Sequence, residues 1–217
     1  FQPDLVHFHN LHGCYLHLPS LCDYLTRRQI PIVWTLHDCW PFTGHCAYFD
    51  YAHCEKWKTG CEHCPQQRSY PVCVGLDRSR KNYEMKKRLF AAFPNLTMVV
   101  PCDWMKVPLS QSFLADRPVR RIYNGVDLRT FYPRPSELRQ KYGLTGKKVA
   151  LAVASDWDER KGLPYLIQTA QELAPDERMV AVGLTREQIG TLPASLLGIE
   201  HTSSPEELAQ WYTTADC

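Results

Sequence analysis

The chain has 217 residues, which suits one or two domains, and 44% of them are hydrophobic and 22% charged, as in a globular protein. Its formal net charge of +2 argues neither for nor against a nucleic-acid partner. No apolar stretch is long enough for a membrane-spanning helix, and no secretion signal is visible. Because the chain starts at Phe1 inside an apolar run and stops at Cys217 just after a helix-like segment, we expect a fragment of a longer protein.

The beginning of the chain predicts a strand, a helix and a second strand. Residues 4–9 predict a short buried strand. Leu18, Leu21 and Leu25 then recur at helical spacing, and residues 32–36 form a β-branched and aromatic run. This order favours a parallel sheet.

After an irregular stretch, the pattern resumes with a basic helix that includes Lys81. Strands are predicted at residues 96–100 and 119–123. Between them, we expect Pro108 to interrupt the stretch after Trp104, which would otherwise predict a helix.

Two prolines near residues 132–136 predict a linker, after which the α/β pattern starts again. Strands are expected at residues 149–154 and 179–182, with a helix at 163–173 between them. Ser204 is placed to cap a further helix, and Glu207 to reach back and complete a capping box. The sequence thus predicts two α/β domains, both incomplete.

Residues 38–75 lack a clean period and are rich in Cys, Trp, Tyr, Gly and Pro. The chain has ten cysteines, which a secreted protein would pair as disulfides and a cytosolic protein would keep reduced or give to a metal. With no secretion signal and an α/β pattern, we favour a cytoplasmic protein.

The cysteines of this segment predict a structural zinc site. Cys61 and Cys64 form a Cys-x2-Cys pair, the spacing with which two thiolates bind one zinc ion. Because the segment has few aliphatic residues to build a core, a metal would supply the missing stabilisation. The alternative is buried free thiols packed with Trp57 and Tyr51. The four expected ligands are Cys46, Cys54, Cys61 and Cys64. Substitute ligands could be Cys39, His45, His53 and His63.

Two loops at predicted strand ends carry candidate binding residues. His37 follows the second strand, where an imidazole could hydrogen-bond a sugar hydroxyl or move a proton. The alternative is a histidine satisfied by backbone in a turn. Because His7, His9 and His12 make no recognisable metal spacing, we interpret them as structural.

The second loop, residues 157–162, joins a strand to a helix at the sheet edge where open α/β folds bind ligands. Arg160 and Lys161 add positive charge to the helix N-terminus, and Gly162 permits close backbone approach. This combination suits a diphosphate. The alternative is an ordinary solvated loop.

In this order, several motifs together resemble GT-B glycosyltransferases of family four, also called group one. They are Pro3-Asp4-Leu5-Val6-His7-Phe8-His9, Thr35-Leu36-His37-Asp38, Asn124-Gly125-Val126-Asp127 with Phe131 and Pro133, and Arg160-Lys161-Gly162. The segments 37–46 and 57–61 resemble a bacterial subgroup of exopolysaccharide and lipopolysaccharide assembly, including colanic-acid-type enzymes.

The resemblance implies a retaining hexosyltransferase with two Rossmann-like domains, both truncated here. Residues 1–132 would form the acceptor-side domain, with a Cys-rich insert at 38–75, and residues 133–217 the nucleotide-sugar-side domain. His37 matches the family's active-site histidine and Lys161 its diphosphate-binding residue, which we expect Ser155, Arg160 and Gly162 to assist.

The same resemblance implies the partners of the protein. They are a nucleotide-sugar donor and a glycan or lipid-linked acceptor, and not a nucleic acid. No cofactor is needed for catalysis. The protein could also bind peripherally to the inner membrane. Ser155 stands where the family often has Arg, and the family's Gly-rich loop and Glu-x7-Glu motif are absent. We therefore expect the chain alone to be inactive.

Two other function classes remain open. A zinc-stabilised binding module is one alternative, although the Cys-rich segment has no basic stripe typical of nucleic-acid readers. A dinucleotide-binding protein is the other, although no Gly-x-Gly-x-x-Gly motif follows any predicted strand.

Overall fold

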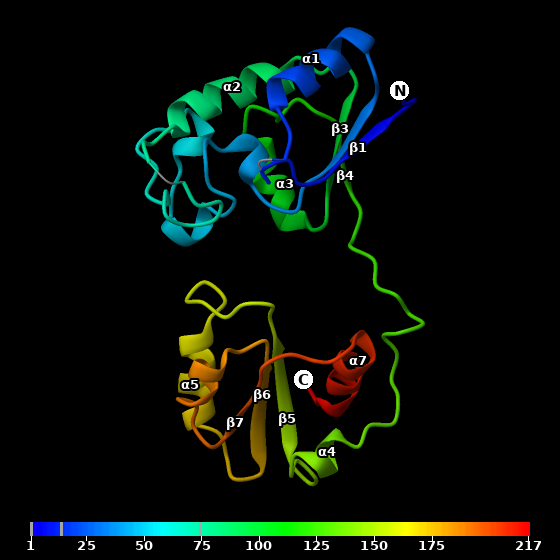
Figure 1. Ribbon diagram of the computed structural model, residues 1–217, viewed down its shortest axis with the longest axis vertical. Helices are drawn as coiled ribbons and strands as arrows, with labels where there is room; N and C mark the ends of the chain where they lie inside the picture. Colours follow the sequence, from blue (N-terminus) through cyan, green and yellow to red (C-terminus); the bar gives the residue numbers. More distant parts are fainter. Residues whose placement is uncertain (1, 14, 74) are drawn as a thin grey trace. The chain divides into compact units, whose positions relative to one another are not determined.

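The computed structural model describes residues 2–13, 15–73 and 75–217. The chain divides into two compact units, Phe1–Asn124 and Gly125–Cys217 (Figure 1). The domain boundary predicted after residue 132 lies in the largely irregular stretch that follows the division, and the assignment of domains by role stays a prediction.

The first unit is built on a four-stranded parallel sheet in the order β1-β2-β3-β4. Val6 pairs with Ile32, Ile32 with Leu96, and Met98 with Val119, so the strands share their carboxyl edge. The strands are β1 (Val6–Phe8), β2 (Ile32–Thr35), β3 (Leu96–Val100) and β4 (Val119–Arg121). The helices are α1 (Leu18–Arg28), α2 (Ser79–Ala91) and α3 (Asp103–Ser110).

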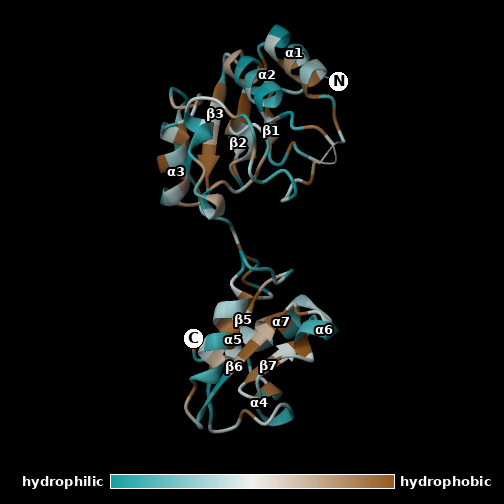
Figure 2. Cartoon of the chain, turned by 90° about the vertical axis from the view of Figure 1, so that its left-hand side faces the viewer, coloured by the Kyte–Doolittle hydropathy of each residue, from teal (hydrophilic) through white to brown (hydrophobic). Residues whose placement is uncertain are grey.

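Aromatic side chains fill the core between this sheet and its helices. The Trp34 ring is fully buried and meets Phe90 edge to face, with ring centroids 4.8 Å apart. Phe8 approaches Trp34 from β1, at 5.5 Å. The apolar strands that supply this core are drawn in brown in Figure 2, and their burial is the main stabilising contribution to the unit.

Although the Cys-rich segment between β2 and α2 has few aliphatic residues, its aromatic side chains pack onto this same core. It contains three short 3₁₀ helices, η1 (Trp40–Phe42), η2 (Asp50–Ala52) and η3 (Lys56–Lys58). Phe42, Phe49 and Trp57 are buried, and the last two stack at 4.5 Å. Trp57 is buried, as the free-thiol alternative assumed, whereas Tyr51 is exposed.

Our prediction that Pro108 interrupts the helix was wrong, because α3 continues through this residue. The helix is only eight residues long, and Pro108 stands near its end, where few backbone bonds are lost. Burial of Met105, Pro108 and Leu109 against the core compensates for the missing N–H.

The second unit is a three-stranded parallel sheet in the order β5-β6-β7. Its strands are β5 (Lys148–Val153), β6 (Glu177–Val182) and β7 (Leu196–Ile199). Its helices are α4 (Leu138–Lys141), α5 (Leu163–Gln171), α6 (Arg186–Ile189) and α7 (Pro205–Thr214). The predicted α/β class with parallel sheets is confirmed in both units.

The start of α7 confirms the predicted cap and corrects the predicted box. The Ser204 hydroxyl accepts the Glu207 N–H at 3.2 Å. The Glu207 carboxylate, however, accepts the N–H of Ser203 at 2.7 Å and its hydroxyl at 2.6 Å, rather than the N–H of Ser204. Because Ser203 offers both its N–H and its hydroxyl, the Glu207 carboxylate accepts two hydrogen bonds from this residue.

Candidate functional site

Histidines from β1 and β2 gather at the carboxyl edge of the first sheet. The parallel register sets the ends of the two strands side by side. His9 Nδ1 lies 2.8 Å from His37 Nε2, and His7 Nε2 lies 2.8 Å from Thr35 Oγ1. His37, interpreted from sequence as a site residue, is exposed and meets a histidine that we interpreted as structural.

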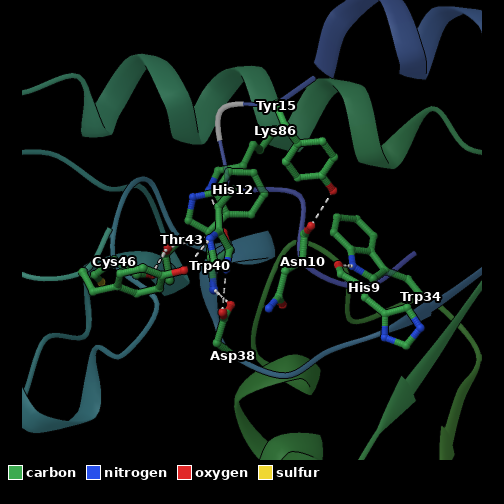
Figure 3. Close-up of polar contacts among 11 residues, drawn as sticks. His9, Asn10, His12, Tyr15, Trp34, Asp38, Trp40, Thr43, Cys46 and Lys86 are labelled. Atoms are coloured by element: carbon green, nitrogen blue, oxygen red, sulfur yellow. Dashed lines mark hydrogen bonds and ion pairs between the residues drawn. The ribbon is translucent and has the colours of Figure 1, made fainter. Parts of the chain in front are cut away.

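The His9–His37 hydrogen bond needs one ring to donate an N–H and the other to accept it. The pair therefore holds together when at most one of the two rings is protonated. Trp34 fixes the position of His9, because its indole N–H donates to the His9 carbonyl at 2.9 Å (Figure 3). A buried core residue thus fixes the backbone that carries one ring of the exposed pair.

A second pair, His12 and Asp38, supports the loop that follows His37. His12 Nε2–H donates to the Asp38 carboxylate at 2.9 Å, and the two side chains are only 4% and 6% exposed. The other carboxylate oxygen accepts the Trp40 N–H at 2.9 Å (Figure 3). The Tyr70 hydroxyl lies 3.1 Å from His12 Nδ1. Together these bonds fix the chain just beyond His37.

In the second unit, the predicted diphosphate-binding residues share one loop at the carboxyl end of β5. Ser155, Arg160 and Lys161 are exposed, and Gly162 has φ +85° immediately before α5. Trp157 anchors the loop, because its indole N–H donates to the Val182 carbonyl at 2.9 Å. Its own carbonyl accepts the Gln188 amide, also at 2.9 Å.

The structure corrects our view of the backbone N–H groups in this loop. Lys161 N–H donates to the Asp158 carboxylate at 2.7 Å, and Gly162 N–H donates to the Asp158 and Glu159 carbonyls. Pro164, in the first turn of α5, has no N–H to offer. The Lys161 ammonium is therefore a stronger candidate for holding an anion than the backbone.

The four predicted zinc ligands line one small cavity in the first unit. Cys46 and Cys64 are hydrogen-bonded to each other, which raises the pKa of the Cys46 thiol and lowers that of Cys64 to about 7. The side-chain positions in the described parts of the chain define no group of three His, Cys, Asp or Glu residues around a metal-sized point.

No helix in the described ranges is both long and apolar enough to cross a bilayer. Sequence reasoning missed the pairing of His9 with His37 and the support from His12 and Asp38. The available sequence signal was that the predicted strands at residues 4–9 and 32–36 each have a histidine at or just after their end, His9 and His37.

The sequence profile of Glycosyltransferase Family 4 matches residues 1–130, more than half of the 217 residues. WcaC of Escherichia coli (strain K12), whose name assigns it as a glycosyl transferase of colanic acid biosynthesis, is 36% identical over 135 residues. That alignment covers 59% of this chain and 32% of WcaC.

Solved structures share the fold. HepE (Alr3699) of Anabaena in complex with UDP-glucose superposes with a TM-score of 0.60 at 17% identity, and its complex with UDP with 0.62 at 19%. Each match covers 98% of this chain and 51% of HepE. Sucrose-phosphate synthase of Thermosynechococcus elongatus gives 0.56 at 18% identity, covering 98% of this chain and 49% of the synthase.

The chain spans about a third of the curated relative and about half of the solved structures that it matches. Both units have the α/β fold that the resemblance to GT-B glycosyltransferases predicted. The profile match over residues 1–130 decides the family: the chain belongs to Glycosyltransferase Family 4.

Proposed function

We propose that the protein containing this chain is a retaining hexosyltransferase of surface polysaccharide synthesis. It moves a sugar from a nucleotide-sugar donor to a glycan or lipid-linked acceptor. Family membership, the name of WcaC and the UDP-glucose held by HepE support this proposal. The observation that carries it is the exposed His37, hydrogen-bonded to His9 at the carboxyl edge of the sheet within the family-matched segment.

His37 would act on the transferred sugar or the acceptor hydroxyl. Its Nε2 is engaged by His9, so Nδ1 is the ring nitrogen left to meet a substrate. A neutral imidazole can accept a proton or a hydroxyl hydrogen bond at that atom. His9 would act as a positioning residue, because it sets the orientation and tautomer of His37.

The loop of residues 154–162 would hold the donor diphosphate. The leaving group gains negative charge as the glycosidic bond breaks, so a contact with the Lys161 ammonium strengthens toward the transition state. Ser155, Arg160 and Gly162 lie in the same loop and would complete the site. Side-chain charge would serve in place of a divalent metal.

The remaining parts of the proposal follow the family pattern. The first unit would bind the acceptor and the second the nucleotide-sugar. A lipid-linked acceptor would bring the cytoplasmic protein to the inner face of the membrane as a peripheral protein.

The test uses the full-length protein with a panel of nucleotide-sugars and lipid-linked or glycan acceptors, and measures nucleotide release together with product. We expect transfer that His37→Ala lowers by roughly 10²–10⁴-fold. The matched control is His17→Ala, an exposed histidine that bonds Ser20 instead. Full activity in His37→Ala, or no transfer with any donor, would overturn the proposal.

A further inference from the structure

Four cysteines of the Cys-rich segment line one cavity in the first unit. Cys46, Cys54, Cys61 and Cys64 line a space of about 10 Å³, roughly the room of a single water molecule. Cys46 lies within electrostatic range of the other three thiols, and Cys61 within range of Cys54 and Cys64. The space is too small for an organic ligand and suits an ion.

The backbone around these cysteines is shaped to present sulfur atoms inward. Cys54 and Cys64 each follow a histidine in the left-handed region, His53 at φ 48° and His63 at φ 46°, a conformation that non-glycine residues rarely adopt. His63 turns the chain within the Cys-x2-Cys pair, so that both thiols can face one point.

A backbone donor already serves one of the sulfur atoms. Gly44 N–H donates to Cys61 Sγ at 3.1 Å. A Cβ at Gly44 would lie 2.5 Å from the Cys61 Cβ and 2.3 Å from the Ser79 carbonyl oxygen. Only glycine permits this approach, which places an N–H against a sulfur atom, as the hydrogen-bond donors around metal-bound ligands do.

A buried lysine stands beside the cluster. Lys86 is 1% exposed, and its amine donates to the Trp40 carbonyl at 2.6 Å and lies 3.7 Å from the centroid of the Trp40 ring (Figure 3). Burial lowers the pKa of Lys86 to about 7, and the nearby Cys61, Cys46 and Asp38 act in the opposite direction. Negative charge on the thiols would therefore favour the protonated amine, and the protonated amine would in turn favour thiolate, the form of cysteine that binds metal.

We propose that Cys46, Cys54, Cys61 and Cys64 bind one zinc ion as four thiolates. Zn²⁺ displaces four protons to solvent, and the resulting site carries two negative charges, one of which Lys86 offsets. The thiols must close around the ion by rotation about their Cα–Cβ bonds, since the described side chains define no ready metal group. This inference does not depend on the proposed sugar transfer.

His45 is the competing fourth ligand. It lines the same cavity, and its buried Nε2 has no hydrogen-bond partner in the described parts of the chain. Three thiolates with His45 would also give a tetrahedral site. We favour four thiolates because Cys61 and Cys64 form a Cys-x2-Cys pair, and Cys46 is already hydrogen-bonded to Cys64.

The test measures metal in the full chain, purified under reducing conditions without chelator. We expect one zinc per chain by elemental analysis. Replacement with cobalt(II) should give the visible d–d bands of a tetrahedral site and the strong near-ultraviolet sulfur-to-cobalt bands of a tetrathiolate. No zinc, together with no such bands on cobalt titration, would overturn the proposal.

Variants separate the ligands. Cys61→Ser and Cys64→Ser should each lower zinc retention at least tenfold in competition with a chromogenic chelator. Cys102→Ser, an exposed cysteine outside the cluster, should retain it fully. His45→Gln should leave the cobalt spectrum unchanged. Because His45 is not a ligand in this assignment, its replacement should not weaken the sulfur-to-cobalt bands. Loss of zinc in His45→Gln, with zinc retained in Cys64→Ser, would overturn the four-thiolate assignment.

Discussion

Removing the imidazole of His12 should destabilise the first unit. In His12→Ala the Asp38 carboxylate, which is 6% exposed beside the imidazole, loses its 2.9 Å donor. A hydrogen bond to a charged group contributes about 1.5–3 kcal/mol. The ring also packs edge to face against Tyr70 at 5.3 Å and tilted over Trp40 at 5.5 Å, contacts of about 0.5–1.5 kcal/mol.

With the two ring contacts taken together, the sum predicts that His12→Ala lowers the free energy of unfolding by about 2–4.5 kcal/mol. The remaining Trp40 N–H bond to Asp38 keeps the loss below that of a fully unpaired charge. Equilibrium denaturation of the full chain, followed by tryptophan fluorescence, measures it. Asp38→Asn keeps the shape and removes the charge, so the two changes should couple by about 1–2 kcal/mol in a double-mutant cycle.

The matched control is His17→Ala, which removes an exposed imidazole bonded only to Ser20. It should change the free energy of unfolding by less than about 0.5 kcal/mol. If His12→Ala costs no more than this control, or if the cycle shows no coupling, the pair does not support the loop as the geometry indicates.

Further predictions concern the two sites and one backbone position. In the full-length enzyme, Lys161→Ala should lower kcat/KM by roughly tenfold to several hundredfold, which is about 1.4–3.5 kcal/mol. Lys161→Arg should restore part of this loss, whereas Glu159→Ala should change kcat/KM little. Wild-type kinetics in Lys161→Ala would place the diphosphate elsewhere. His9→Ala should lower kcat more than it raises KM, as expected of a positioning residue, and an equal effect of His17→Ala would remove that role. Gly183→Ala should lower the free energy of unfolding by about 3 kcal/mol or more, because its φ is +98° and a Cβ would lie 1.7 Å from the Ala154 oxygen. Its control, Gly143→Ala at φ +66° with open space around it, should cost only about 1–2 kcal/mol; thermal or chemical unfolding of both variants decides whether the clash adds to the backbone strain.

Most strands were predictable because their apolar runs are bounded by turn residues. The run from Ile32 to Leu36 and the run from Leu96 to Val100 are confirmed nearly residue for residue. The last strand, β7 (Leu196–Ile199), was missed because it is short and contains Gly198, a residue that weakens a strand pattern. Gly198 is there because Ile189, Leu192 and Leu184 leave no room for a Cβ.

Short helices were the other elements that the sequence prediction missed. The Thr185–Gln188 capping box, which starts α6, could have been recognised from the sequence alone. The aromatic packing of residues 38–75 could not, because Phe42, Phe49 and Trp57 follow no helical or strand period. Only their burial in the completed unit shows that they belong to its core.

The candidate site likewise contains residues that could be predicted from the sequence and residues that could not. His37 and Lys161 could be singled out because each stands at a predicted strand or loop end, a local feature. The partnership of His9 with His37 depends on the parallel register of β1 and β2, which sequence spacing does not encode. A shift of one residue in that register would turn every side chain of the strand to the opposite face, and His9 away from His37.

The histidine site and the cysteine cluster are connected through one residue, Trp40. Its N–H is held by Asp38 at 2.9 Å, and its carbonyl by Lys86 at 2.6 Å. Asp38 follows His37 directly in the chain, while Lys86 is the buried lysine beside Cys46 and Cys61. These hydrogen bonds form one continuous chain from the cysteine cluster to the backbone just beyond His37. Through Trp40, the Cys-rich segment thus supports the candidate active-site loop.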